Sequence, residues 1–121
     1  MADRPLTIAV DFDGVIADYD GWKGDEAVGA PRPDVIDALR LLRTEGWKIV
    51  VYSSRGTDEL TKYLVENRVP FDEINRNSSF QTGGTKPVAN VYWDDRACCY
   101  SGDARRDLEI IRNFRTWNGR K

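Results

Sequence analysis

The stretch Thr7-Ile8-Ala9-Val10-Asp11-Phe12-Asp13-Gly14-Val15-Ile16-Ala17-Asp18 is the most informative part of this chain. Its apolar first half predicts a buried strand that ends at Asp11. Gly14 then allows a sharp turn, so that the Asp13 carboxylate can approach the space that Asp11 faces. Two carboxylates about 4 Å apart repel by roughly 4 kcal/mol at an effective dielectric of about 20, unless a cation or a proton lies between them. The pattern favours a divalent metal, or one acid and one base, over a surface turn that is merely rich in Asp and Gly.

Composition limits the classes of protein that this chain can belong to. It has 121 residues, of which 40% are hydrophobic and 31% charged, and a net charge of -2. These values predict one globular domain over residues 1–121 and give no strong nucleic-acid signature. The chain has no histidine, which excludes histidine triads and histidine zinc sites. Any catalysis must therefore use Asp, Glu, Lys, Arg, Ser and metal ions.

The sequence also predicts where the protein works. No apolar run is long enough to span a membrane, so no membrane partner is expected. The first five residues, Met1 to Pro5, do not resemble a signal peptide. Cys98 and Cys99 are adjacent and would make a poor structural crosslink, which suits a reducing compartment. A cytoplasmic location is the expectation.

Strand-like and helix-like segments alternate along the chain, which is typical of an α/β sheet with parallel strands. We predict a Rossmann-like three-layer sandwich with a central, mainly parallel sheet of about four strands. The last helix should present Leu108, Ile111 and Phe114 to the sheet, and residues 116–121 should form a frayed tail. The expected strands cover residues 7–11, 48–52, 71–74 and 90–93, and the expected helices begin near residues 33, 58 and 103.

Polar residues follow three of these strands at the point where each strand ends. The carboxyl ends of parallel strands meet at one edge of the sheet, where such folds bind ligands. Lys86, just before the fourth strand, can bring a cation to the same rim. Carboxylates, a hydroxyl and a lysine around one point suggest Mg²⁺ and a phosphate, because magnesium prefers hard oxygen ligands. The three strand-end pairs are Asp11 with Asp13, Ser53 with Ser54, and Asp94 with Asp95.

The order of these motifs resembles that of the haloacid dehalogenase-like superfamily. The matching features are Asp-Phe-Asp-Gly-Val at 11–15, a strand-end serine, Lys-Pro at 86–87 and Asp-Asp-Arg at 94–96. The chain looks most like the small, capless magnesium-dependent phosphatases, although Val15 stands where threonine often follows the glycine. The segments between the motifs are too short for a cap domain. The resemblance therefore implies an open site, which takes a small or macromolecular phosphorylated substrate or borrows a lid from a second copy of the chain.

The resemblance also implies catalytic roles for individual residues of a phosphomonoester hydrolase. Asp11 would be the nucleophile that forms an aspartyl-phosphate, and Asp13 the general acid and base. Ser53 would donate a hydrogen bond to a phosphoryl oxygen, with Ser54 as the alternative. Lys86 would offset charge on the nucleophile and the transferring group.

Metal binding and substrate contacts follow from the same resemblance. Mg²⁺ would be held by Asp11, the backbone carbonyl of Asp13 and Asp94, with Asp95 binding it directly or through water. The expected substrate contacts are Gly14, Trp22, Ser54 and Arg55. Arg55 contacts the substrate or pairs on the surface. Trp22, in the polar segment 18–30 that forms a flap in this superfamily, stacks on a leaving group or packs in the core.

Two alternative functions are considered beside the phosphatase. Response-regulator receiver domains also use Asp, Ser or Thr, Lys-Pro and Mg²⁺. In a receiver, however, the phosphorylated aspartate follows the third strand and Lys-Pro follows the fifth. Here the third strand ends at Asn75, and Lys86 precedes the second acidic pair. The other alternative is a catalytically silent phosphate-binding protein of the same superfamily, and the complete acidic set argues against it.

Overall fold

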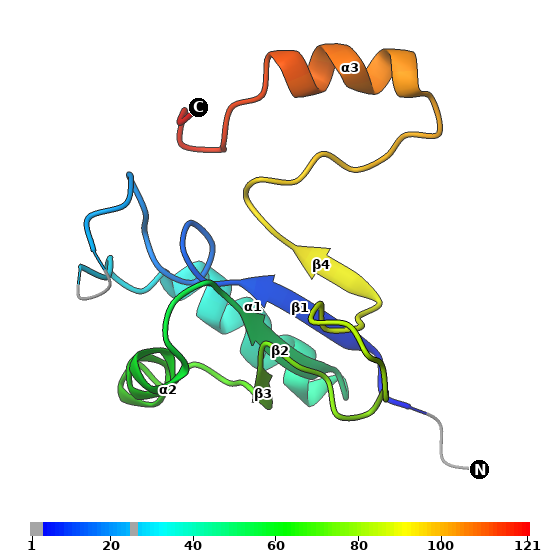
Figure 1. Ribbon diagram of the computed structural model, residues 1–121. Coiled ribbons are helices and arrows are strands. Elements are labelled where there is room, and N and C mark those ends of the chain that lie inside the picture. Colours follow the sequence, from blue (N-terminus) through cyan, green and yellow to red (C-terminus); the bar gives the residue numbers. More distant parts are fainter. Residues whose placement is uncertain (1–3, 25–26) are drawn as a thin grey trace.

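The computed structural model describes residues 4–24 and 27–121. One parallel sheet, in the order β3-β2-β1-β4, forms its centre (Figure 1). This sheet and three helices confirm the predicted α/β class, and no cap domain is evident in these two ranges. The strands are β1 (Thr7–Asp11), β2 (Lys48–Tyr52), β3 (Glu73–Ile74) and β4 (Val91–Trp93), and the helices are α1 (Pro33–Thr44), α2 (Thr57–Glu66) and α3 (Ala104–Arg112).

The hydrophobic core lies between one face of the sheet and the helices α1 and α2. Alternate residues of a strand share a face, so every second residue of β1 and β2 enters this core. Phe12, in the loop after β1, packs edge-on against Tyr63 of α2 with ring centroids 5.0 Å apart, which anchors that loop in the core. The strands contribute Ile8, Val10, Ile49 and Val51, α1 contributes Val35, Ile36 and Leu39, and α2 contributes Leu60 and Leu64.

The segment between β3 and β4 covers the opposite face of the sheet. Its buried residue Asn77 donates from Nδ2 to Thr7 Oγ1 (3.3 Å) and to the Val88 carbonyl (2.9 Å). The Nζ of Lys48, on the same face of the sheet, donates to Asn77 Oδ1 at 2.8 Å and pairs with Glu73 at 2.7 Å. This polar network holds the segment against the face of the sheet that a helix would cover in the predicted three-layer sandwich.

The prediction that α3 packs against the sheet is wrong. This helix lies apart from the sheet (Figure 1), and its Leu108 and Ile111 are 44% and 56% exposed. Phe114, beyond the end of α3, is partly buried. Local signals make the helix, because the Asp103 side chain accepts hydrogen bonds from the two backbone N–H groups that follow Ala104. Such signals do not specify where a helix docks.

The prediction that residues 116–121 fray is also wrong. These residues turn back toward the loop after β1, and Thr116 is buried. Trp117 Nε1 donates to the Gly14 carbonyl at 2.8 Å, and Asn118 Nδ2 donates to the Tyr19 carbonyl at 2.8 Å. Both acceptors lie about a hundred residues earlier in the chain, so no local pattern in the sequence predicts these contacts.

The described residues contain no helix with both the length and the apolar character needed to cross a membrane. Residues 1–3, part of the start that does not resemble a signal peptide, lie outside the described residues, as do residues 25 and 26 of the expected flap.

Candidate active site

Three carboxylates meet at the carboxyl edge of the sheet. Asp11 ends β1, and Asp94 and Asp95 follow β4, which pairs in parallel with β1. Each of the three contributes one carboxylate oxygen to a group whose members lie within 4.8 Å of one another. The structure therefore brings together three of the four residues expected to hold a metal, here called the carboxylate cluster.

The carboxylate cluster is electrostatically unbalanced. Burial, a hydrogen bond with Asp95 and the charges of Asp94 and Asp95 together raise the pKa of Asp11 to about 8. The backbone N–H of Phe12 opposes this by donating to Asp11 Oδ1 at 2.9 Å. Asp95 Oδ1 is buried and accepts no hydrogen bond from the described residues. An orphaned oxygen beside two further carboxylates fits a divalent cation, since Mg²⁺ takes hard oxygen ligands.

Asp94 is held by two donors that fix its orientation. The Tyr52 hydroxyl donates to Asp94 Oδ2 at 2.5 Å, and the Arg96 backbone N–H donates to Oδ1 at 2.8 Å. Burial and this hydrogen bond raise the pKa of Tyr52, so its hydroxyl stays protonated as a donor. Tyr52 was not among the predicted site residues. The signal for it is the sheet register, which places Tyr52 opposite Asp11.

Asp95 is held from the C-terminal end of the chain. Its side chain is 2% exposed, and Asp95 Oδ2 accepts a short hydrogen bond from Arg120 Nη2. The Arg120 guanidinium also lies over the Tyr19 ring, 4.6 Å from its centroid. The sequence does not predict Arg120 as a site residue, because residues 116–121 have the composition of a frayed end.

Gly14 lies directly against this ion pair. Its φ is +88°, in the region that favours glycine. A Cβ at this position would lie 2.1 Å from Asp95 Oδ2 and 3.1 Å from Arg120 Nη2. Gly14 is thus required both by its backbone conformation and by the close approach of Asp95. Its expected role as a substrate contact stays a prediction.

The Asp13 carboxylate points to a different partner. Arg55 binds both of its oxygens, with Nε at 2.8 Å from Oδ2 and Nη2 at 3.1 Å from Oδ1. Arg55 is buried, and it also donates to the carbonyls of Gly24 (3.4 Å) and Ala27 (3.3 Å). The prediction of a surface pair is therefore wrong. The pair is internal, and it ties the loop after β1 to the end of β2.

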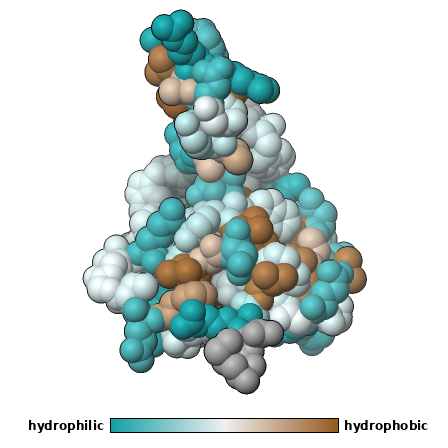
Figure 2. Space-filling view, turned by 90° about the vertical axis from the view of Figure 1, so that its right-hand side faces the viewer, coloured by the Kyte–Doolittle hydropathy of each residue, from teal (hydrophilic) through white to brown (hydrophobic). Residues whose placement is uncertain are grey.

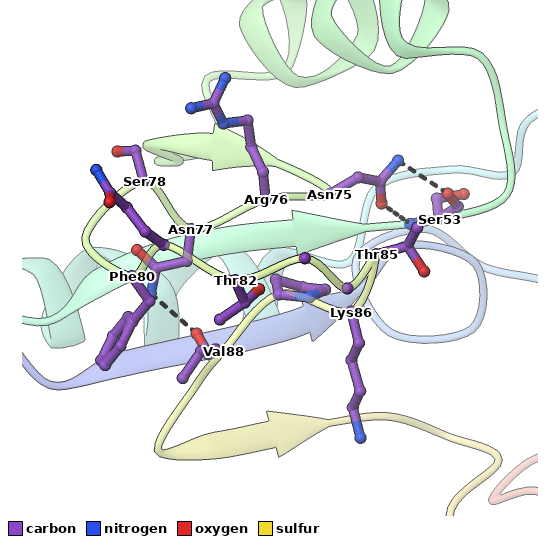
Figure 3. A pocket seen from close by; sticks show the side chains of 14 residues that line it. Ser53, Asn75, Arg76, Asn77, Ser78, Phe80, Thr82, Thr85, Lys86 and Val88 are labelled. Carbon is purple, nitrogen blue, oxygen red and sulfur yellow. Dashed lines mark hydrogen bonds between the residues drawn. The ribbon is translucent and has the colours of Figure 1, made fainter.

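Ser53 is oriented by its neighbours, whereas Ser54 is exposed. Ser53 Oγ accepts the Arg55 backbone N–H at 3.1 Å, which leaves its hydroxyl hydrogen free to be donated. The Asn75 side chain accepts from the Ser53 N–H (2.9 Å) and donates to the Ser53 carbonyl (3.1 Å). Ser53 also lines a polar cavity of about 1000 Å³ formed by residues 75–88 (Figure 3). This geometry favours Ser53 over Ser54 as the hydroxyl that would donate to a phosphoryl oxygen. Asn75, which orients Ser53, is a further residue that the sequence does not predict.

Lys86 and Trp22 lie at the margins of the site. The Lys86 side chain points toward β4 (Figure 3), with Nζ 4.3 Å from the centroid of the Tyr92 ring, and it shares a second cavity with Asp94. Trp22 is 57% exposed, so the alternative that placed it in the core is wrong. Its ring faces the Arg55 guanidinium at 4.9 Å, and Trp22 therefore covers the Asp13–Arg55 pair from the solvent side.

Comparison with solved structures finds a similar chain, a conserved protein from Bacteroides thetaiotaomicron. The two align with a TM-score of 0.65 and 25% sequence identity, over 96% of this chain and 97% of the other. No protein-family model matches the chain, and no curated protein matches it either. The likeness supports the small α/β fold along the whole chain. Function has to be argued from the site itself.

Proposed function

We propose that this protein is a magnesium-dependent phosphomonoester hydrolase in which Asp11 forms an aspartyl-phosphate. The carboxylate cluster supports this proposal most, because its three oxygens lie within 4.8 Å of one another. A buried oxygen of Asp95 also lacks a partner among the described residues. The order of the motifs, from Asp11 to the Asp-Asp-Arg at 94–96, is the reason for assigning a phosphate ester as the substrate of this metal site.

Asp11 is the candidate nucleophile. Mg²⁺, held by Asp11, Asp94 and Asp95, would reduce the negative charge around the phosphate. One Asp11 oxygen forms a bond to phosphorus while the bond from phosphorus to the ester oxygen breaks. Water then attacks the phosphorus of the aspartyl-phosphate, which releases inorganic phosphate and restores the carboxylate. The Phe12 N–H, 2.9 Å from Asp11 Oδ1, holds the nucleophile in one orientation.

Asp13 and Ser53 are the candidates for proton transfer and phosphate binding. Asp13 would protonate the leaving oxygen and then accept a proton from the attacking water. Arg55 engages both Asp13 oxygens, so this role requires one of the two contacts to open when substrate binds. Ser53 would donate its hydroxyl hydrogen to a phosphoryl oxygen, since its Oγ already accepts the Arg55 N–H.

One observation favours a second candidate, a phosphate-binding protein without turnover. Arg55 occupies both oxygens of the Asp13 carboxylate. Asp13 can exchange a proton with a leaving oxygen or a water only when one of these oxygens is free. If the pair does not open, Mg²⁺ and phosphate would still bind, but esters with poor leaving groups would not be cleaved.

The substrate class and the location belong to the same proposal. The described residues place no cap over the sheet edge, which suits a small phosphate ester or the phosphorylated end of a macromolecule. A cytoplasmic location is supported by the free thiols of Cys98 and Cys99.

A panel of phosphate esters tests the proposed function. The panel would include p-nitrophenyl phosphate, sugar phosphates, nucleotides and 5′-phosphorylated oligonucleotides, each with Mg²⁺ and with excess EDTA. We expect turnover that EDTA abolishes, because the carboxylate cluster cannot hold a phosphate dianion without a cation. Full turnover in EDTA would exclude the metal assignment. Binding of Mg²⁺ and phosphate with no turnover of any ester would favour the second candidate.

A further inference from the structure

A polar cavity of about 1000 Å³ lies beside Ser53, and none of the proposed catalytic steps uses it. The segment between β3 and β4, residues 75–88, forms the rest of its lining (Figure 3). Small-molecule sites in proteins have volumes of about 300–1,000 Å³. The cavity is therefore large enough to hold the organic part of a substrate whose phosphate lies at Ser53.

The cavity is open to solvent. Residues 81–86, which line it, are all exposed. Figure 2 shows a narrow projection above the body of the molecule, at the height that α3 has in Figure 1, so this helix stands clear of the body. No described residue of α3 lines the cavity. A ligand can therefore enter while the C-terminal part of the chain stays in place.

The leaving group of a bound ester would lie next to this cavity. The backbone N–H of Arg55 donates to Ser53 Oγ at 3.1 Å, and the Arg55 side chain binds both oxygens of Asp13. Arg55 thus places Ser53, the candidate phosphate donor, beside Asp13, the candidate acid for the leaving oxygen. The carbon atoms attached to that oxygen would continue into the space that Ser53 lines.

The charge around the cavity is positive. Arg76 and Lys86 line it, and no acidic residue among the described ones does. Glu73 pairs with Lys48 at 2.7 Å and with Arg76 at 3.3 Å, so a single carboxylate is shared by two cations. This surplus of positive charge favours a ligand that carries an anionic group of its own.

The stretch of residues 82–86 supplies hydrogen-bond donors that the protein itself does not use. None of its backbone N–H groups donates to a described residue. The hydroxyls of Thr82 and Thr85 have no partner among the described residues either. Backbone N–H groups in a concave loop can bind anions, and hydroxyls can both donate to and accept from the hydroxyl groups of a sugar.

A nucleobase fits this lining poorly. Phe80 is the single aromatic residue of the lining, and the Arg4 guanidinium already lies over its ring, 4.3 Å from the centroid. Proteins that bind single-stranded nucleic acid depend on the stacking of bases on aromatic side chains. The cavity therefore favours a compact, hydroxyl-rich ligand over the end of an oligonucleotide.

We propose that residues 75–88 bind the leaving group of the substrate, and that this substrate is a sugar phosphate with a second anionic group, a phosphate or a carboxylate. This assignment rests on the proposed function, because the phosphate site at Ser53 is what places the ester beside the cavity. The second anionic group would lie against Arg76 and the backbone N–H groups of residues 82–86.

Calorimetry and steady-state kinetics on the full chain with Mg²⁺ test this proposal, using matched pairs of esters. The pairs are fructose 1,6-bisphosphate with fructose 6-phosphate, ribulose 1,5-bisphosphate with ribulose 5-phosphate, and 6-phosphogluconate with glucose 6-phosphate. The second group is a phosphate in the first two pairs and a carboxylate in the third. In at least one pair, the ester with two anionic groups should bind at least about tenfold more tightly and have a correspondingly lower KM. A smaller difference in every pair would overturn the proposal.

Three variants place the preference in the cavity. Thr82→Glu adds a negative charge beside the donors of residues 82–86, Thr82→Gln adds the same bulk without the charge, and Thr61→Glu adds the charge on α2. Thr82→Glu should reduce the preference for the second anionic group at least about tenfold, because like charges repel. Thr82→Gln and Thr61→Glu should retain the preference. An equal preference in Thr82→Glu and Thr82→Gln would contradict the assigned position of the second anionic group.

Binding and turnover together separate this proposal from the proposed function. Preferential binding of esters with two anionic groups, without hydrolysis, would support the cavity as their site and contradict the phosphatase. Hydrolysis of p-nitrophenyl phosphate with no preference within any pair would support the phosphatase and overturn the assignment of the cavity. Hydrolysis of 5′-phosphorylated oligonucleotides in preference to every sugar ester would overturn that assignment as well.

Discussion

Asp11 and Asp13 are separated by one residue, yet they lie in opposite environments. Asp11 faces Asp94 and Asp95, and the mutual repulsion and burial of these groups raise its pKa to about 8. Asp13 faces Arg55, which binds both of its oxygens. Arg55 thus balances the charge of Asp13 within the chain, whereas the negative charges around Asp11 remain largely unbalanced. The divalent cation that we propose for the cluster around Asp11 would relieve this imbalance.

The contrast extends to the surroundings of each carboxylate. Arg55 is buried and is held by carbonyls of the loop before α1 and by the Trp22 ring. Both oxygens of Asp13 therefore have a partner within the chain. On the Asp11 side, Arg120 binds Asp95 Oδ2 while Oδ1 keeps no partner among the described residues. Variants of the two sides should therefore behave differently in both activity and stability.

The largest effect is expected for Asp11→Asn. The neutral amide is a poor nucleophile, so turnover of p-nitrophenyl phosphate should fall to the background rate, and no acyl-phosphate should be trapped by acid quenching. The folded protein should be retained, since the substitution removes a repelling charge. Turnover of Asp11→Asn at the parental rate would contradict the role of Asp11 as the nucleophile.

Asp13→Asn should affect both rate and stability. A general acid or base contributes about 10²- to 10⁴-fold to turnover, and the loss should be smallest for p-nitrophenyl phosphate, which needs little protonation of its leaving group. The substitution also removes the charged acceptor of two hydrogen bonds from the buried Arg55, which should lower the unfolding free energy by about 1–3 kcal/mol. Urea denaturation measures this loss. If Asp13→Asn were as stable as the parent, the contrast between the two aspartates would fail.

The metal-free protein should become less stable as the pH rises from about 4 to about 8. Burial and then Asp95 and Asp94 raise the Asp11 pKa from 3.8 to about 8, so between these values the folded state binds more protons than the unfolded state. Unfolding free energy therefore falls with rising pH across this window. Thermal melts in EDTA measure the slope, which both saturating Mg²⁺ and Asp11→Asn should flatten. A slope unchanged in Asp11→Asn would assign the titration to other groups.

The smallest effect is expected for Gly14→Ala, with Gly46→Ala as the matched control. Both glycines have nearly the same φ, +88° and +90°, but only Gly14 has Asp95 where a Cβ would lie. Each substitution should cost about 1 kcal/mol through its backbone conformation. Gly14→Ala should in addition displace Asp95 and weaken Mg²⁺ binding measured by calorimetry. Equal Mg²⁺ affinities in the two variants would show that Asp95 does not depend on the close approach of Gly14.

The sequence predicts the sheet and the carboxylate cluster well, for a physical reason. The strand around Val10 is apolar and ends in a carboxylate, and parallel pairing brings the end of β4 beside it. These features depend on periodicity and topology alone. The same reasoning could not predict the Asp13–Arg55 pair in detail, because an arginine can turn toward solvent or inward with the same sequence around it.

The arrangement of the C-terminal part could not be predicted from the sequence. The pattern around Leu108 correctly predicts a helix, yet not where the helix lies, because docking depends on a surface distant in the sequence. Arg120 and Trp117 lie in a short polar stretch that is typical of a frayed end. Their partners, Asp95 and Gly14, become apparent only when the loop after β1 and the end of the chain are seen together.

Calorimetric titration with Mg²⁺ tests the central claim most directly. We predict one site per chain in the parent protein, at least tenfold weaker binding in Asp94→Asn, and binding within a factor of about two of the parental affinity in Trp22→Ala, which lies on the Asp13 side. The absence of Mg²⁺ binding to the parent protein, or equal affinities in the parent and Asp94→Asn, would contradict the claim that the carboxylate cluster holds a divalent cation.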